Sequence, residues 1–237
     1  MNTPMQFDVI VGNPPYQGGD LGHSAYKSLW PVFWKKCLEL TKPDGFVYLV
    51  TPTTWCSPTS DLAPRDSYNR MTRLWDVFQS FTSKANISDI KRHFPGVGSS
   101  FGIVSVDKSG RDGLSFSDGR QSQLGFIPMS GSDEVHANLS HQDNISSRHI
   151  ISAKAETDYQ VTLFKSRKVC DGNVKVLAKG ERFDEETPET LFVSINTNTK
   201  DEAIIVRDRV LECAEILNRH CRYNGFIDQK ILGMIKL

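Results

Sequence analysis

Hydrophobic and polar positions near the start of the chain predict a strand, a helix and a second strand. Residues 7–12 hold the apolar run Val9 to Val11 ahead of two prolines, a pattern typical of a short buried strand. Apolar side chains then recur at helical spacing after a Ser24 cap: Tyr26, Leu29, Trp30, Phe33, Cys37 and Leu40. A turn at residues 42–45 precedes an apolar strand at 46–50. A strand, a helix and a strand of this length form a βαβ unit, which implies parallel strands.

The next part of the chain predicts a further helix and two further strands. The helix spans Arg65 to Phe81 and has Met71, Leu74, Trp75 and Phe78 on one face. Ile87 to Ile90 is a short strand. The alternating segment Phe101 to Lys108 predicts a strand antiparallel to its neighbour, closing the sheet edge as a hairpin. We therefore expect residues 1–109 to form one α/β region.

The polar character of residues 110–150 separates this region from the rest of the chain. They are rich in Ser, Gly, Asp, Asn and Gln, which favours a linker or a loosely ordered excursion. Beyond them, alternating residues from Val161 to Phe183 and the run Leu191 to Ile195 predict strands. Asp201 to Cys221 predicts an amphipathic helix. Residues 151–237 are therefore expected to form a small α+β region.

The composition fits one or two globular domains and narrows the class of protein. The chain has 237 residues, of which 38% are hydrophobic and 24% are charged. It contains no run of about 18 apolar residues and no basic-then-apolar leader pattern, so we expect a cytoplasmic protein without a membrane span. The five cysteines are dispersed without CxxC spacing, which favours reduced thiols and gives no support to a metal site.

The charge distribution gives a mixed signal about nucleic acid. The formal net charge is zero, whereas a dedicated duplex binder usually has a basic surface. A basic cleft is still compatible with this value, because an opposite face can be acidic. Positively charged residues cluster at three places: Lys35–Lys36, Lys91–Arg92 and the group Lys165, Arg167, Lys168, Lys175 and Lys179. The pair Lys35–Lys36 is best explained as part of a solvent-exposed face.

The strongest chemical signal is the loop Asn13-Pro14-Pro15-Tyr16 after the first strand. In open α/β sheets, ligands bind outside the carboxyl ends of the strands. The prolines stiffen the loop, and Asn13 is held extended because it precedes a proline. The Asn13 side-chain oxygen and the Pro14 carbonyl can then accept both N–H bonds of an exocyclic amino group, while Tyr16 stacks on its planar ring. The alternative is a simple tight turn, because Pro and Asn are common turn formers.

The stretch Asp8-Val9-Ile10-Val11-Gly12-Asn13-Pro14-Pro15-Tyr16-Gln17 resembles the catalytic motif of N6-adenine-specific DNA methyltransferases of restriction–modification systems. The resemblance implies methyl transfer from S-adenosylmethionine to a flipped-out adenine in double-stranded DNA. It implies that Asn13 and Pro14 accept hydrogen bonds from the adenine amino group and that Tyr16 stacks on the ring. Asn13 and Pro15 would lie close to the methyl donor. Similar tetrapeptides occur in methyltransferases of protein glutamine and ribosomal RNA, so RNA or a protein amide is an alternative substrate.

The segment from His93 to Lys108 is similar to the same family, in which an aromatic-Pro turn supplies a second ring against the base. By position Phe94 matches that role, with Phe101 in reserve. The resemblance implies a Rossmann-like methyltransferase sheet, here its C-terminal half, with parallel strands ending in an antiparallel hairpin. Residues 151–237 would then lie where the family has a target-recognition domain. A small domain that only stabilises the sheet is the alternative.

The donor-binding loop of such an enzyme is not visible in this sequence. A self-sufficient member of the family has a Gly-rich loop ahead of the catalytic motif, whereas six residues precede Phe7. A permuted order has no support either, because Phe94 to Gly98 leads into a strand instead of a helix. We therefore expect a second polypeptide that supplies the donor-binding half, or an unusual cofactor site. The third possibility is an inactive fragment that binds nucleic acid or a partner subunit.

Overall fold

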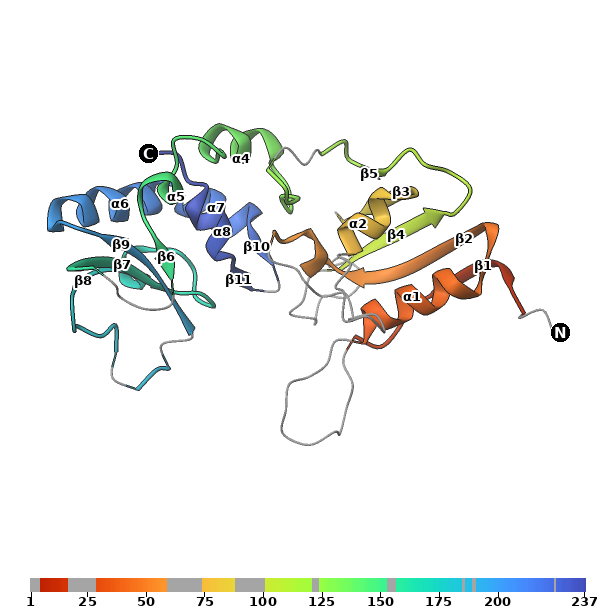
Figure 1. Ribbon diagram of the computed structural model, residues 1–237, viewed down its shortest axis with the longest axis horizontal. Helices are drawn as coiled ribbons and strands as arrows, with labels where there is room; N and C mark the ends of the chain where they lie inside the picture. The colour runs from red at the N-terminus through yellow and green to blue at the C-terminus, as the bar shows by residue number, and fades with distance from the viewer. Residues whose placement is uncertain are drawn as a thin grey trace. The chain divides into compact units, whose positions relative to one another are not determined.

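The computed structural model divides into two units, Met1–Gln121 and Ser122–Leu237, which are described separately (Figure 1). The structure describes residues 5–16, 29–58, 74–87, 101–120, 124–152, 157–184, 186–188, 191–223 and 225–237.

The first unit is built on a mixed five-stranded sheet with the order β1-β2-β4-β3-β5. Its strands are β1 (Phe7–Gly12), β2 (Thr41–Pro52), β3 (Thr82–Asn86), β4 (Phe101–Asp107) and β5 (Leu114–Phe116). β1 pairs with β2 in parallel through the predicted βαβ connection, which is confirmed. β4 is antiparallel to both of its neighbours, as the alternating segment predicts. The unit is thus an α/β fold with a mixed sheet, compatible with a methyltransferase-like fold.

One face of this sheet is covered by α1 (Trp30–Leu40), α2 (Leu74–Gln79) and the 3-10 turn η1 (Thr53–Cys56). Trp34 is completely buried, and its indole N–H donates a hydrogen bond to Thr51 Oγ1 at 2.9 Å. Phe78 of α2 meets the rings of Trp34 and Trp55 edge-on at centroid distances of 4.9 and 5.0 Å. These aromatic side chains form the core of the unit. The helical spacing correctly predicts that Trp30 is buried, but it is wrong for Phe33, which is 39% exposed while its neighbour Trp34 faces the core.

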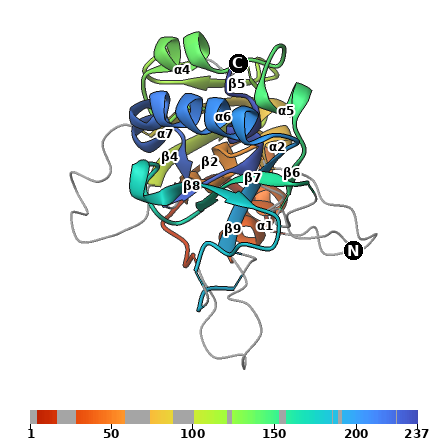
Figure 2. The same ribbon diagram turned by 90° about the vertical axis from the view of Figure 1, so that its left-hand side faces the viewer.

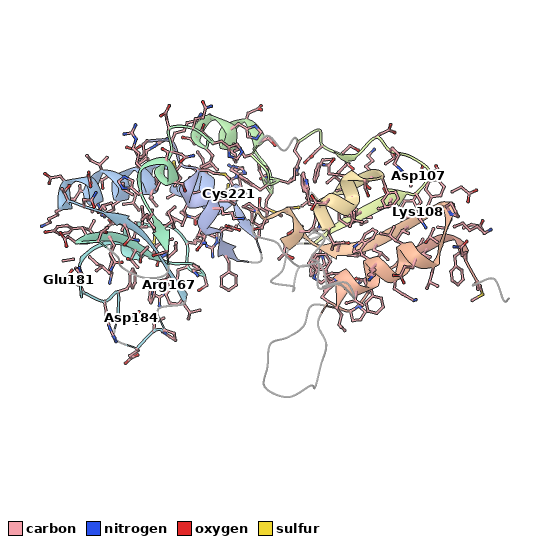
Figure 3. The ribbon with its side chains drawn as sticks, viewed as in Figure 1. Asp107, Lys108, Arg167, Glu181, Asp184 and Cys221 are labelled. Atoms are coloured by element: carbon pink, nitrogen blue, oxygen red, sulfur yellow. The ribbon has the colours of Figure 1, made fainter. Side chains whose placement is uncertain are left out.

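Lys108 fixes the C-terminal end of α1 to the end of β4. Its Nζ donates hydrogen bonds to the carbonyl oxygens of Leu38 at 2.7 Å and Thr41 at 2.5 Å. A cation at this place satisfies helix carbonyl groups that have no intrahelical partner. Partial burial lowers the pKa of Lys108, which Figure 3 labels beside Asp107.

Three details of the first unit differ from the sequence prediction. The strand expected at Ile87 to Ile90 lies earlier, at β3, because its core-facing residues Ser83 and Ala85 are too small to produce an apolar alternation. Residues 88–90 lie outside the described chain. β4 lies between β2 and β3 instead of at the sheet edge. The turn expected at residues 42–45 is instead part of β2. The strand already begins at Thr41, which pairs with Phe7, and a register shift separates this pair from the next pair, Val9 with Phe46.

The second unit contains a four-stranded antiparallel sheet with the order β6-β9-β7-β8, covered by α6 (Figure 2). The elements of the sheet layer are β6 (Ile151–Ser152), β7 (Tyr159–Phe164), β8 (Val174–Ala178), β9 (Phe192–Thr197) and α6 (Lys200–Glu212). The others are α4 (Ser132–Asn138), α5 (Ile145–Arg148), η2 (Asp171–Asn173), α7 (Ala214–His220), β10 (Arg222–Tyr223), β11 (Phe226–Ile227) and α8 (Gln229–Gly233). The strands predicted within 161–183 and at 191–195 are confirmed.

Buried polar contacts order this second unit. All six residues of β9 are buried, and Thr162 of β7 shares a hydrogen bond of 2.9 Å with Ser194 of β9. His220 is buried at the end of α7, where its two ring nitrogens contact Ser130 Oγ at 2.7 Å and Glu134 Oε2 at 3.1 Å. The His220 contacts connect α7 to α4, so the ring acts as a satisfied structural histidine.

Two segments of the second half have a different structure from the one their composition suggests. The helix expected from Asp201 to Cys221 is divided at Cys213, whose ψ of 1° is not helical. Residues 110–150, for which the composition favours a linker, contain β5, α4 and α5. Several of their few apolar residues, including Val135 and Ile145, are fully buried, so a polar composition does not prevent local order.

Three further properties of the described residues concern membrane-crossing helices, cysteine thiols and possible metal ligands. None of its described helices combines the length and apolar character that crossing a bilayer requires. All five cysteines carry free thiols, and burial raises the pKa of Cys221 to about 12. Within the described ranges, no three His, Cys, Asp or Glu side chains converge as a metal-binding set.

Thr51→Val should destabilise the first unit by about 1–3 kcal/mol, because the buried Trp34 indole N–H loses its acceptor. Urea unfolding followed by tryptophan fluorescence measures this, since all four tryptophans belong to that unit. Thr51→Ser keeps the hydroxyl group and is the matched control, which should cost clearly less. Equal losses in the two variants would show that the hydrogen bond is not the source of the stability.

Candidate functional site

The candidate site lies where the carboxyl ends of β1 and β2 meet. Gly12 ends β1 and is followed directly by the loop Asn13-Pro14-Pro15-Tyr16. Because β1 and β2 are parallel, Pro52 at the end of β2 lies at the same edge of the sheet. Antiparallel β4 begins there, since Phe101 pairs with Pro52. The fold thus brings the loop and Phe101 together, although they are far apart in the sequence.

The loop is tied together by a hydrogen bond between its first and last residues. The Tyr16 hydroxyl donates to Asn13 Oδ1 at 2.6 Å. The backbone N–H of Leu29, just before α1, donates to the Tyr16 carbonyl at 3.0 Å. Pro14 is buried, whereas Asn13 and Pro15 are exposed. The buried proline anchors the loop, and the exposed residues on either side of it face solvent.

Phe101 supports the ring of Tyr16 from one side. The two rings stack with a centroid distance of 4.9 Å and an interplanar angle of 25°, and Phe101 is buried. A base inserted between them would need a separation of roughly 7 Å, which is two stacking distances of about 3.4 Å. In this arrangement Phe101 therefore supports one face of the Tyr16 ring, and no base fits between the two rings.

The other aromatic residue that the sequence singles out, Phe94, lies outside the described residues. Its role as a second wall stays a prediction, and so does direct contact of Phe101 with a substrate. The Tyr16–Phe101 stack itself is not visible in the sequence, because it depends on the register of β4 against β2. The contact between Asn13 and Tyr16 is different, since the short spacing of the two residues already places them on one loop.

The loop offers hydrogen-bond acceptors beside an aromatic ring. Asn13 Oδ1 keeps one lone pair after accepting from Tyr16, and the Pro14 carbonyl is a second acceptor. Burial raises the pKa of Tyr16, so its hydroxyl stays protonated and continues to donate to Asn13 at neutral pH. The loop contains no carboxylate, amine or imidazole. It therefore suits binding and orientation of a planar group with N–H donors better than acid–base catalysis.

A second candidate surface lies on β7, β8 and their flanking residues in the second unit. Arg167 lies over the ring of Phe164 at 4.6 Å, and Lys175 lies over the ring of Phe183 at 4.3 Å. Lys168 and Lys179 are exposed beside them. Acidic neighbours are present too, because Asp184, labelled near Arg167 in Figure 3, has a pKa lowered by hydrogen bonds from Thr187 and by the arginine charge. Together with Lys165, these four cations are called the basic group below.

The N-terminal part of the chain matches a known protein family. Residues 1–81 match the model of the family described as Eco57I restriction-modification methylase. The matched stretch contains β1, the Asn13–Tyr16 loop, α1 and β2, and it ends before Phe101 and the second unit. No curated protein matches the chain. The match supports DNA methylation within restriction–modification as the general function of this region, and methylases generally take the methyl group from S-adenosylmethionine.

The ionisation of Tyr16 should report on the contact with Phe101. In Phe101→Ala the tyrosine ring loses its buried neighbour, so its pKa should fall toward the ordinary value of about 10. Alkaline titration of phenolate absorbance measures it, with Tyr16→Phe in each background identifying the Tyr16 signal. Phe226→Ala, which removes an exposed ring of the second unit, is the control. An unchanged Tyr16 titration in Phe101→Ala would contradict the supporting role of Phe101.

Proposed function

We propose that this chain forms the substrate side of a methyltransferase that modifies the N6 amino group of adenine in double-stranded DNA. The observation that carries the proposal is the Tyr16 ring, tied to the Asn13 amide at the carboxyl end of β1 within the stretch that matches a methylase family. An aromatic platform beside two acceptors fits a base that carries an exocyclic amino group. Adenine is such a base, and its amino group has two N–H bonds to donate.

The chain's residues would hold and orient the adenine. The remaining lone pair of Asn13 Oδ1 and the Pro14 carbonyl accept the two N–H bonds, which leaves the nitrogen lone pair directed away from the loop. When S-adenosylmethionine is bound, it supplies a methyl group on a positively charged sulfur. Direct attack of the nitrogen on that methyl group would form the N–C bond as the sulfur–methyl bond breaks, with S-adenosylhomocysteine as the leaving group and no covalent enzyme intermediate. The amino proton would pass to solvent, because the loop contains no carboxylate, amine or imidazole. Asn13 and Pro15, both exposed at this end of β1, are proposed to contact the donor.

Stacking on Tyr16 would offset the cost of taking adenine out of the duplex. Base flipping costs a few kcal/mol, and stacking of a base on an aromatic side chain contributes about 1–3 kcal/mol. Phe101 would hold the tyrosine ring in place before the base arrives, which reduces the ordering cost of binding. Phe94 is proposed as the wall on the opposite side of the base.

The basic group of the second unit is proposed to contact the phosphate backbone of the DNA. Arg167 and Lys175 are held over aromatic rings, which restricts their side chains without removing their charge. Lys168 follows β7 and Lys179 follows β8, and both lysines are exposed. Phosphate contacts of this kind position a protein on a duplex without reading its sequence.

Tyr16→Ala should lose most methyl transfer, because the base loses its stacking platform. Tyr16→Phe keeps the ring but removes the hydrogen bond to Asn13, so it should retain more activity than Tyr16→Ala. The assay follows a tritiated methyl group from S-adenosylmethionine into adenine-containing duplex, with RNA and protein substrates in parallel. Near-normal transfer by Tyr16→Ala would refute the role of the ring, and labelling of RNA or protein alone would refute DNA as the substrate.

Asn13→Ala should also reduce transfer strongly, because one of the two acceptors for the amino group is removed. Asn13→Asp keeps an acceptor oxygen and separates the loss of the hydrogen bond from the loss of the amide group. Binding of duplex DNA should change less than methyl transfer in both variants, because the loop orients the reacting group. Equal losses in binding and transfer would contradict the orienting role.

Lys168→Gln and Lys179→Gln should each weaken binding to duplex DNA. The observed binding constant Kobs should also depend less on salt, because the slope of log Kobs against the logarithm of the salt concentration becomes shallower by about 0.9 for each phosphate that the variant no longer neutralises. Fluorescence anisotropy of a labelled duplex over a series of salt concentrations measures the slope. Lys36→Gln removes an exposed lysine of α1 and is the matched control. An identical slope in all three variants would place the phosphate contacts elsewhere.

A further inference from the structure

The second unit carries an exposed aromatic ring on the tight hairpin that β10 and β11 form (Figure 1). Phe226 of β11 is 48% exposed, which makes it the most exposed aromatic residue of this unit. It pairs with Tyr223 of β10 across a two-residue turn. Gly225 in that turn has a φ of 83°, a left-handed conformation that hairpin turns use and that glycine adopts without strain. The turn therefore fixes the place of the Phe226 ring at the tip of the hairpin.

Buried residues on both strands hold this hairpin rigidly. Tyr223 is 4% exposed, and its hydroxyl donates a hydrogen bond to the carbonyl oxygen of Ile127. The Tyr223 ring also meets Phe126 edge-on at a centroid distance of 6.5 Å. Ile227, the neighbour of Phe226 on β11, is buried. An exposed ring on so firmly held a strand loses little conformational entropy when it meets a partner.

The hairpin is bonded directly to the segment that carries most of the basic group. The backbone N–H of Ile227 donates a hydrogen bond to the Lys165 carbonyl at 3.0 Å. Arg222, on the other strand, donates from Nη2 to the Ser166 carbonyl at 2.8 Å. Residues 165–168 contain three of the five cations of the basic group. The exposed ring and these cations are therefore held together by the backbone of the same unit.

The charge beside the hairpin favours an anionic partner. Residues 165–168 hold three cations and no carboxylate. Asp228, which directly follows β11, is buried, and its carboxylate caps α8. The carboxylate of Asp184 accepts a hydrogen bond from the backbone N–H of Thr187 at 2.7 Å. These two carboxylates are engaged within the unit, so positive charge dominates the segment to which the hairpin is bonded.

The combination of one exposed ring with cations narrows the kind of partner. An exposed apolar residue alone is no evidence for a ligand, because such residues are common on protein surfaces. A ring flanked by cations, however, fits a nucleic acid, whose bases stack on rings and whose phosphates are neutralised. A binder of single strands presents several rings to successive bases, whereas here the rings of Phe164 and Phe183 already lie under cations of the basic group. One exposed ring on a rigid hairpin fits insertion at one step of a duplex better.

We propose that Phe226 is a wedge that inserts between neighbouring base pairs of the DNA duplex held by the basic group. The cations contact phosphates, which positions the protein without reading the sequence. The ring separates two base pairs and stacks on one of them, so it favours steps that unstack easily, such as TA and CA/TG. The wedge thus adds a sequence preference that the phosphate contacts lack. The identity of the nucleic acid as DNA rests on the proposed function, whereas the contact with bases rests on the hairpin and the basic group.

A duplex with an abasic site tests the insertion, because a missing base lowers the free energy needed to open the stack. The probes are two labelled DNA duplexes of the same sequence, one intact and one with a central abasic site. Fluorescence anisotropy with the full chain gives the Kd for each, without methyl transfer. We expect the chain to bind the abasic duplex about tenfold more tightly. Phe226→Ala should bind both duplexes equally, whereas Phe226→Tyr keeps the ring and should keep the preference.

Ile205→Ala removes an apolar side chain that is 64% exposed on α6, so it is the matched control and should keep the preference. Salt dependence separates insertion from a structural role of the ring. Loss of an apolar contact lowers the affinity but leaves the slope of log Kobs against the logarithm of the salt concentration unchanged. Circular dichroism verifies that the variants fold, because the second unit contains no tryptophan. If Phe226→Ala unfolds this unit, Phe226→Thr, which removes the ring and favours a strand, replaces it.

Four results would overturn the wedge. These are equal affinities of the unaltered chain for the two duplexes, a preference that survives in Phe226→Ala, a changed salt slope in that variant, and a preference that only RNA duplexes show. The changed slope would mean that the ring merely holds the basic group in place.

Tyr16→Ala separates the wedge from the candidate site of the first unit, because a flipped base also favours a weakened duplex. The preference should survive in Tyr16→Ala, and its loss there but not in Phe226→Ala would assign it to that site and overturn the wedge. A preference that depends on Phe226 without methylation of adenine would support the wedge and refute the proposed function. Methylation of adenine without the preference would refute the wedge alone, so the two failures are distinguishable.

Discussion

The parallel pairing of β1 with β2 under α1 is the constraint on which the candidate site depends. The two strands run in the same direction because a helix connects them, so their carboxyl ends reach the same edge of the sheet. The buried hydrogen bond from Trp34 to Thr51 fixes α1 near that edge, and Lys108 fixes its other end. The stiff loop after β1 is therefore carried by a rigid frame, and its chemistry is local to that frame.

The loop is organised before any ligand arrives. Pro14 is buried, the Tyr16 hydroxyl is bonded to Asn13, and Phe101 supports the tyrosine ring. Under the proposed function, groups that are already fixed would lose little conformational entropy when a base binds, so more of the interaction energy would remain to keep the base out of the duplex. The hydrogen bond to Tyr16 also occupies one lone pair of the Asn13 amide, which leaves one for the substrate.

The same strand that delivers this loop has an apolar face. Val9 and Val11 of this strand are 50% and 75% exposed, and Phe46 and Tyr48 of β2 continue the apolar surface beside them. The exposed residues of β3, Lys84 and Asn86, are polar, so the apolar surface does not extend across the whole sheet.

Local sequence determined the elements whose patterns are strong, and tertiary structure decided the rest. The strand at Val9 to Val11, the helix after Leu29 and the Asn13–Tyr16 loop are readable because periodicity and proline stiffness act over a few residues. The burial predicted for that strand is wrong, because Val9 and Val11 are 50% and 75% exposed. The position of β4 inside the sheet is not readable, because it depends on pairing between distant strands. The order within residues 110–150 is not readable either, because few apolar residues mark it. The Tyr16–Phe101 stack and the uncovered face depend on register and on which face α1 selects. Pairing between distant strands sets both of these, and no local pattern encodes it.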